Sequence, residues 1–328
     1  MKTARKATLI LLAFAVLATL PGCKGANSES GGGKINVVCT VYPQYDWVCE
    51  IIGNRADSFE LTLLVDGRAD LHSYQPSFDD RVKISACDLF IYVGGESDDW
   101  VEDMLDDATN KRRRVINLLD ELGEAAKVEE IIEGMEDDED DEEEDDEDEP
   151  EYDEHVWLSL KNAALFCEVI TREISALDPD GAAEYAANLA AYTSALDALD
   201  ARYAEAVNAA PIRTIIVADR FPFRYLADDY GIDYYAAFPG CSAETEASFD
   251  TIVFLAAKAD EPTSGAIVVT ESSDKSVAAA VRNETAKKDK AIIVLDSMQS
   301  VSQNDISRGT SYLSVMESNL GALKEALK

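Results

Sequence analysis

Hydrophobic positions along this chain follow two patterns: short apolar runs, and longer segments in which apolar residues recur at helical spacing. The short runs, rich in β-branched residues, predict strands at 34–41, 59–65, 88–93, 114–118, 214–218, 234–237, 266–270 and 291–295. Segments with helical spacing lie between them, and the last predicted helix runs from 312 to the end. Strands that alternate with helices form parallel sheets. The pattern therefore predicts an α/β protein of two lobes, each a mainly parallel sheet flanked by helices.

One alanine-rich segment, 182–209, carries apolar residues at helical spacing without a break. It predicts a single long helix, which at 1.5 Å per residue spans roughly 40 Å. We therefore expect an N-terminal lobe at 34–177, a connecting helix at 178–210 and a C-terminal lobe at 211–328. A helical connector bends less readily than a loop, so this order also predicts a rigid joint between the lobes.

The first 23 residues have the pattern of a lipoprotein signal peptide. Three basic residues precede an apolar run at 7–20 that is too short for a lasting membrane span. The run ends at Gly22-Cys23, as in the bacterial lipobox, so we expect lipidation of Cys23; ordinary cleavage that leaves a free Cys23 is the alternative. The polar segment 24–33 predicts a flexible tether. This places the protein at the cell surface or the periplasmic side, anchored to the cell membrane.

The chain is strongly acidic, with a formal net charge of −36. This charge argues against nucleic acid and anionic lipid as partners, because both would be repelled, and favours cationic partners. In the tract 136–154, every residue except Pro150 and Tyr152 is Asp or Glu. Such a segment has no apolar groups to bury, so it predicts a solvated loop. Two interpretations stay open: a solubilising insert, or a weak collector of cations.

The cysteine spacing matches no zinc-finger or redox motif. Cys39, Cys87 and Cys167 lie within apolar runs and are expected to be small core residues. One disulfide elsewhere in the chain stays possible. We find no phosphate-binding glycine loop and no Gly-x-Ser-x-Gly motif, so the sequence gives little support to an enzyme, a metal hydrolase included.

The chain contains two histidines, His72 and His155, and each follows acidic residues at the boundary of a predicted element. Neutral imidazole is the commonest protein ligand for zinc, although a lone histidine is more often a surface or core residue. Asp219, Glu271 and Asp296 directly follow three apolar strands of the second half. Because the carboxyl ends of parallel strands meet at one edge of a sheet, these acids are expected to gather there, as metal ligands or as helix caps.

Several segments resemble one family, the zinc and manganese solute-binding lipoproteins of ABC importers (cluster A-I). They are VYPQY (41–45), DLHSYQPS (70–77), YVGGES (92–97), HVWL (155–158), YG (230–231), TESS (270–273) and LDS (295–297). The matching segments follow the same order over nearly all of the chain after the signal peptide. The resemblance implies two lobes bridged by a rigid helix, with one metal ion bound in the cleft between them.

The resemblance also implies the ligands. His72 and His155 match the two histidine ligands of the first lobe, and Asp296 matches the acidic ligand near the end. The family ligand after the first strand of the second lobe is absent: an ungapped alignment places Arg220 there, and a guanidinium cannot bind a metal. One inserted residue would place Asp219 at that position, and Glu271 is the substitute candidate.

We therefore expect a receptor, not an enzyme, that binds zinc and delivers it to an ABC permease with its ATPase. Manganese is the alternative cargo, because an oxygen-rich site with two histidines also suits it. A surface adhesin or binding module on the same fold is the second alternative. In zinc members of the family the loop before the second histidine is often rich in histidine; here it is acidic, which favours the collector interpretation. We expect a monomer.

Overall fold

The computed structural model describes residues 33–67, 71–136, 151–242 and 246–328. Lys34–Lys328 form one compact unit. The expected signal peptide with Cys23, nearly all of the tether and most of the acidic tract lie outside the described residues. No helix in the part that the structure describes is long and apolar enough to cross a membrane.

Eight strands form two parallel sheets within the described residues. The first has the order β2-β1-β3-β4 and the second the order β6-β5-β7-β8. The bounds are β1 Ile35–Cys39, β2 Phe59–Leu63, β3 Leu89–Tyr92, β4 Arg114–Asn117, β5 Thr214–Arg220, β6 Asp233–Phe238, β7 Ser264–Thr270 and β8 Ile292–Leu295. Every pairing is parallel. The α/β fold with two parallel sheets, expected from the hydrophobic pattern, is therefore confirmed.

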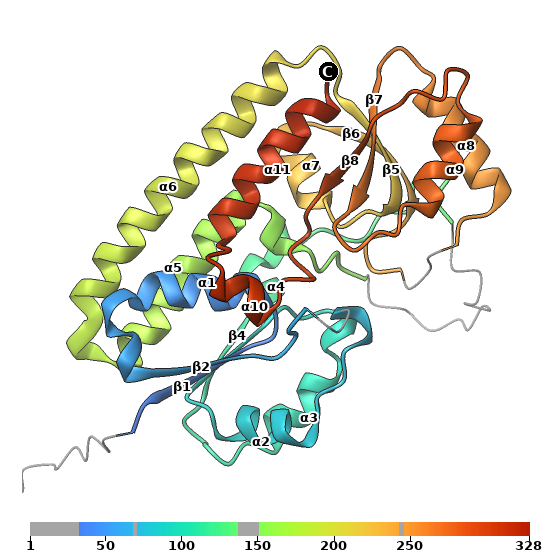
Figure 1. Cartoon of the computed structure of the whole chain (residues 1–328). Coiled ribbons are helices and arrows are strands. Elements are labelled where there is room, and N and C mark those ends of the chain that lie inside the picture. The colour runs from blue at the N-terminus through green and yellow to red at the C-terminus, as the bar shows by residue number, and fades with distance from the viewer. Residues whose placement is uncertain (1–32, 68–70, 137–150, 243–245) are drawn as a thin grey trace, which may run out of the picture. The chain divides into compact units, whose positions relative to one another are not determined.

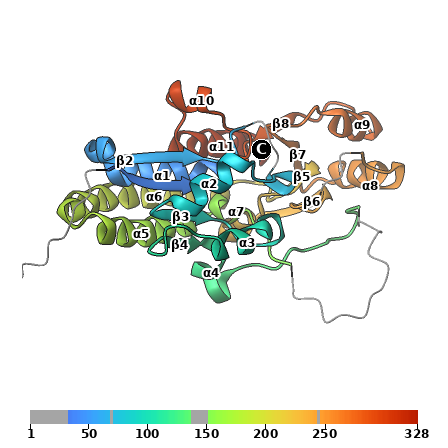
Figure 2. The ribbon, with the colours of Figure 1, turned by 90° about the horizontal axis from the view of Figure 1, so that it is seen from below.

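Helices flank both sheets, as Figures 1 and 2 show. The bounds are α1 Tyr42–Ile52, α2 Phe78–Ala86, α3 Trp100–Asp106, α4 Leu118–Leu122, α5 Leu160–Leu177, α6 Ala182–Ala209, α7 Arg224–Tyr230, α8 Phe249–Ala259, α9 Ser276–Glu284, α10 Gln303–Ser307 and α11 Tyr312–Ala326. Helix α6 has 28 residues and occupies the range expected for the connecting helix. It packs beside α11, where the Tyr203 hydroxyl donates to the carbonyl of Met316 at 2.6 Å.

Helix α1 begins at Tyr42 with Pro43 in its first turn, where proline is tolerated because its missing N–H has no partner to lose. The short helices α4 and α10 were not predicted, since five residues are too few to show a helical period. Cys39, Cys87 and Cys167 are buried, as expected for core residues.

Buried polar contacts join the parts of the chain before and after α6. The Trp157 ring N–H donates to the carbonyl of Ser297 at 2.8 Å, and the Tyr312 hydroxyl donates to the carbonyl of Trp157 at 2.7 Å. The backbone N–H of Tyr312 donates to Asp46 at 3.0 Å. Breaking such a buried bond would leave an unsatisfied polar group, which costs about 1–3 kcal/mol. These contacts oppose relative movement of the two sheets.

Candidate metal centre

His72 lies in a 3₁₀ turn, Leu71–Ser73, in the loop between β2 and α2. Leu71 is buried and holds this turn against the core. The Nδ1 atom of His72 lies 2.8 Å from the Ser97 hydroxyl and 3.5 Å from Oε2 of Glu154. The imidazole is thus held between a hydroxyl and a carboxylate, with its side chain only 8% exposed.

His155 is fully buried directly before the 3₁₀ turn Val156–Leu158, whose three side chains are also buried. Oδ1 of Asp153 accepts from the His155 backbone N–H at 2.8 Å and lies 3.2 Å from its ring Nδ1. A carboxylate at Nδ1 fixes the proton there and leaves the lone pair on Nε2. Nε2 is buried and has no hydrogen-bond partner among the described residues. An imidazole in this state can bind a metal ion through Nε2.

The two imidazoles lie side by side, with ring centroids 5.3 Å apart and planes inclined by 55°. His72 and His155 are far apart in the sequence, yet the parallel sheet brings the loops that carry them to the carboxyl ends of its strands. The structure therefore brings together the two histidines that the sequence singled out.

Glu154, the last acid of the tract, is buried beside His72. Its Oε1 accepts from the Ser97 N–H at 2.8 Å, and a side chain at Gly95 would lie 2.6 Å from that oxygen. Burial opposes ionisation of Glu154, but its interactions with His72 and Ser97 hold its pKa below the usual value. Glu154 is therefore an ionised carboxylate whose position depends on the small residue at 95.

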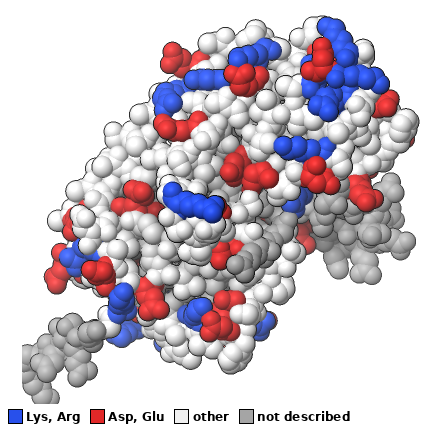
Figure 3. Space-filling view, in the orientation of Figure 1, with Lys and Arg blue, Asp and Glu red and all other residues white. Residues whose placement is uncertain are grey.

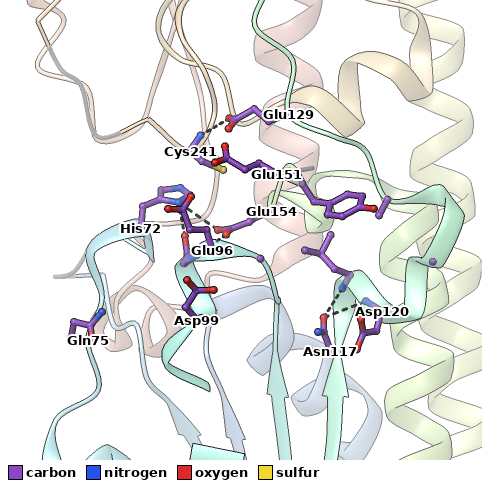
Figure 4. A pocket seen from close by; sticks show the side chains of 16 residues that line it. His72, Gln75, Glu96, Asp99, Asn117, Asp120, Glu129, Glu151, Glu154 and Cys241 are labelled. Atoms are coloured by element: carbon purple, nitrogen blue, oxygen red, sulfur yellow. Dashed lines mark hydrogen bonds and ion pairs between the residues drawn. The ribbon is translucent and has the colours of Figure 1, made fainter. Parts of the chain in front are cut away.

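Cys241 approaches His72 and Glu154 from the loop that follows β6, as Figure 4 shows. Potential ligand atoms of His72, Glu154 and Cys241 lie within 4.8 Å of one another, the one such group of three or more among the residues that the structure describes. The Cys241 backbone N–H donates to Oε1 of Glu129 at 2.9 Å. Burial and the neighbouring carboxylates, Glu154 first among them, raise the pKa of the Cys241 thiol.

A pocket of about 1020 Å³ lies around this group. His72, Glu154 and Cys241 line it, together with Gln75 and Ser97. Carboxylates dominate its polar lining: Glu96, Asp99, Asp120, Glu129, Glu151 and Glu154. A concave site with several acids and a histidine favours a cation over an anion or an apolar ligand.

Asp219, Glu271 and Asp296 gather at the carboxyl ends of β5, β7 and β8, which are neighbours in the second sheet. Oδ2 of Asp219 accepts from the Thr270 N–H at 3.0 Å and its hydroxyl at 2.8 Å. Glu271 accepts from the Ser297 N–H at 2.7 Å. These carboxylates stabilise loops of the second sheet in this structure.

Asp296 lies beside Glu271, and its Oδ1 accepts from the Met298 N–H at 2.8 Å. Burial and the charge of Glu271 raise the pKa of Asp296 to about 6. Neither Asp219, Glu271 nor Asp296 belongs to the described group of ligand atoms within 4.8 Å. The structure thus brings the predicted residues together as a histidine pair and, separately, as a carboxylate edge.

Sequence reasoning missed Glu154 and Cys241 as potential ligands. Glu154 was included only as one of many acids in the tract, although its position directly before His155 was a usable signal. Cys241 matched no ligand spacing, because its partners lie far away in the sequence. Its place after a predicted strand of a parallel sheet was the one feature that pointed to a site.

The described flanks of the acidic tract are held in place. On one side, the Glu136 N–H donates to the carbonyl of Ala237 at 2.8 Å, and its carboxylate accepts from the Ser248 N–H. On the other, Val128 and Tyr152 form an antiparallel bridge, and Glu151 and Tyr152 line the pocket. The segment 137–150 between these flanks lies outside the described residues. The first residue of the tract therefore contacts β6 and the start of α8, and the described residues at its other end line the pocket.

Figure 3 shows acidic and basic side chains interspersed on one face of the molecule, without one continuous acidic surface. The tract holds the densest acidic stretch of the sequence. Clustered carboxylates of this kind raise the local concentration of cations.

The chain matches the family described as "ZnuA: Zinc-uptake complex component A periplasmic" over residues 37–326. It is 31% identical over 326 residues to the zinc-binding lipoprotein AdcA of Streptococcus pneumoniae TIGR4, covering 98% of this chain and 61% of that protein. It is 29% identical over 303 residues to the high-affinity zinc uptake system protein ZnuA of Bacillus subtilis. That match covers 92% of this chain and 90% of the relative. The chain thus spans about three fifths of the AdcA relative.

Solved structures of zinc-binding proteins also match this chain. The Zn(II)-bound ZnuA-like domain of S. pneumoniae AdcA aligns with a TM-score of 0.69 at 28% identity, covering 90% of this chain and 99% of that one. The periplasmic zinc-binding protein TroA of Treponema pallidum aligns with a TM-score of 0.70 at 22% identity, covering 90% of this chain and 99% of that one. At this identity the match supports the fold alone. These matches confirm the resemblance drawn from the sequence. With its family match from residue 37 to residue 326, this chain belongs to the ZnuA family of solute-binding receptors.

Proposed function

We propose that this chain is a receptor outside the cytoplasm that binds one zinc ion and delivers it to an ABC permease driven by its ATPase. The adjacent imidazoles of His72 and His155, 5.3 Å apart beside the acidic pocket, carry this proposal. The names of the relatives support zinc as the cargo. Because the family is one of receptors, the expectation of a protein that is not an enzyme agrees with it.

The chemistry of the histidine pair, His72 and His155, favours zinc as the metal. Zinc is bound by neutral imidazole, carboxylate and thiolate, usually by four ligands in a tetrahedron. Asp153 orients His155 so that Nε2 can donate its lone pair. His72 and His155 are the two nitrogen ligands of the proposal, and Asp219, Glu271 and Asp296 remain candidates for the oxygen ligands. The zinc ion here is cargo and takes part in no reaction.

Manganese is the second candidate cargo, and the six carboxylates that line the pocket favour it. Manganese prefers carboxylate, carbonyl and water oxygens, whereas imidazole also suits zinc. The choice between the two metals therefore depends on which side chains complete the coordination around the histidine pair.

Lipidation of Cys23 would hold the receptor at the membrane surface, and the tether 24–33 would allow it to reach the permease. Relatives described as lipoproteins support this anchor. In this arrangement the receptor acts as a monomer and the acidic tract supplies cations to its pocket.

Calorimetric titration with zinc and with manganese tests the proposal. We expect one tight zinc site per chain and weaker binding of manganese. His72→Ala and His155→Ala should each abolish the tight site, whereas Gln75→Ala, a change at the exposed rim of the same pocket, should leave it intact. Failure of the wild-type protein to bind either metal tightly would contradict the proposal.

A further inference from the structure

We propose that Cys241 and Glu154 complete the metal site with His72, and that the sulfur ligand makes this site prefer zinc over manganese. The proposal rests on the proposed function and names the ligands that decide its cargo. The group contains one nitrogen, one oxygen and one sulfur donor within 4.8 Å of one another. The ring of His155 lies outside this group, with its centroid 5.3 Å from that of His72, and would supply the fourth donor that zinc usually takes.

Glu154 is built into the site as a metal ligand would be. Its Oε1 is held by the Ser97 N–H at 2.8 Å, and its Oε2 lies 3.5 Å from Nδ1 of His72. Oε2 is buried and accepts no hydrogen bond among the described residues. A buried carboxylate oxygen without a hydrogen-bond partner is costly unless another group compensates it, as a bound metal ion would. The carboxylate is therefore oriented toward the point where His72 and Cys241 converge.

Cys241 is placed by a tight loop. Gly240 packs so closely that a side chain there would lie 3.2 Å from Nδ1 of His155 and 2.9 Å from the Phe221 carbonyl. On the other side of Cys241, the Arg220 guanidinium donates to the carbonyl of Ser242 at 3.3 Å. The loop is thus fixed against the second histidine, and Glu129 fixes the backbone of Cys241 itself.

Nε2 of His155 is a second, independent sign of a ligand. The His155 side chain is fully buried, and Nε2 finds no hydrogen-bond partner in the described part of the chain. Burying an imidazole lone pair without a partner costs about 1–3 kcal/mol. A metal ion held by His72, Glu154 and Cys241 would supply that partner, because the two rings are neighbours.

The thiol sets the selectivity. Soft thiolate ligands select zinc, whereas manganese prefers oxygen ligands. A coordinated thiol is deprotonated, so binding forms one metal–sulfur bond and releases the thiol proton to solvent. No described cysteine is paired with another, so Cys241 is not consumed by a disulfide. The same pocket without sulfur would be a nitrogen and oxygen site that accepts both metals.

A structural role for Cys241 makes a different prediction. If its thiol only filled space, replacement by serine would disturb packing slightly and would leave the metal spectrum unchanged. If its thiol binds the metal, replacement removes the sulfur bond and reduces the preference for zinc. The two roles therefore separate in spectroscopy, independently of any transport assay.

Cobalt(II) is the direct probe, because a cobalt–thiolate bond gives an intense near-ultraviolet charge-transfer band. We expect the cobalt-loaded wild-type protein to show this band. Cys241→Ser should lose it, and Glu154→Gln should keep it with weaker binding. Cys49→Ser is the matched control, since Cys49 lies on α1 and does not line the pocket, and it should keep the band. Thermal unfolding of each variant checks that the fold persists.

Competition titrations measure the selectivity. Cys241→Ser removes a direct ligand, so it should lower zinc affinity by at least the ~10–100-fold that loss of an outer-shell partner costs, and should change manganese affinity much less. A cobalt-loaded wild-type protein without the charge-transfer band would overturn the inference even without any variant. So would an unchanged zinc-to-manganese ratio in Cys241→Ser. Tight zinc binding together with either result would leave the proposed function standing, whereas absence of all tight binding would contradict both.

Discussion

The imidazole of His155 contacts Asp153 through Nδ1, at 3.2 Å from Oδ1, and leaves its buried Nε2 without a hydrogen-bond partner among the described residues. The ring that carries this buried nitrogen lies beside His72, with the two ring centroids 5.3 Å apart. A buried, unpaired ring nitrogen is destabilising in a protein core and useful at a metal site. The pair Asp153 and His155 therefore supports the metal site that we propose.

Asp153→Asn should weaken zinc binding without removing a ligand. The amide can donate to Nδ1 instead of accepting from it, which shifts the ring proton onto Nε2 and blocks the lone pair. Loss of such a supporting partner costs about 10–100-fold in metal affinity. Competition against a chromophoric chelator measures this. Equal affinities of the variant and the wild-type protein would show that Asp153 does not set the tautomer.

Asp219→Ala and Glu271→Ala test whether the carboxylate edge of the second sheet supplies a ligand. Both acids hold loops through hydrogen bonds to Thr270 and Ser297, so each substitution should lower thermal stability. If the ligands are His72, His155, Glu154 and Cys241, zinc affinity should stay nearly unchanged in both variants. Loss of the tight site in one variant only would identify that acid as a ligand and would revise the coordination set.

Deleting 137–149 tests the collector interpretation of the acidic tract. This deletion keeps Glu136 with its bond to Ser248, and keeps the Val128–Tyr152 bridge. We expect the tight zinc site to be nearly unchanged and several weak sites to disappear, because clustered carboxylates hold divalent ions weakly. Equilibrium dialysis against calcium counts the weak sites. A large loss of tight zinc affinity would contradict the division between a collector and a binding site.

Asp46 predicts a pH dependence of stability that has no connection with metal. It accepts hydrogen bonds from the Tyr312 N–H and the Tyr42 hydroxyl, yet burial raises its pKa from 3.8 to about 6. A carboxyl whose pKa is higher in the folded than in the unfolded protein contributes most to stability at pH values below its unfolded-state pKa. This contribution is lost as the pH rises through its folded-state pKa. Relative to Asp46→Asn, the wild-type free energy of unfolding should therefore fall by about 2–3 kcal/mol between pH 4 and 7.

Urea unfolding of both proteins at several pH values measures this difference. The asparagine of the variant keeps the size of the side chain but does not titrate, so the substitution removes the pH-dependent contribution of this position alone. Unfolding curves of wild type and Asp46→Asn that shift in parallel with pH would show that Asp46 ionises normally in the folded protein.

The fold was largely predictable because its signals are local. An unbroken helical period over 182–209 is enough to define α6, and β-branched runs are enough to define the strands. The same rules could not detect α4 and α10, whose five residues complete little more than one turn.

The candidate site was predictable only in part, because the residues that form it are distant from one another in the sequence. His72 and His155 were recognisable from their loop positions and from being the two histidines of the chain. The approach of Cys241 depends on the packing of Gly240 against His155, which no local pattern encodes. Glu154 was hidden among neighbouring acids, and it is distinguished by its position beside His72 and Cys241 and by its hydrogen bond to Ser97, which only the structure shows.

The most direct test of the central claim is a crystal structure of the zinc-loaded protein with anomalous scattering data at the zinc absorption edge. We expect one anomalous peak per chain, at about 2.0–2.1 Å from a ring nitrogen of His72 and of His155. A single peak bound elsewhere, with neither histidine among its ligands, would contradict it.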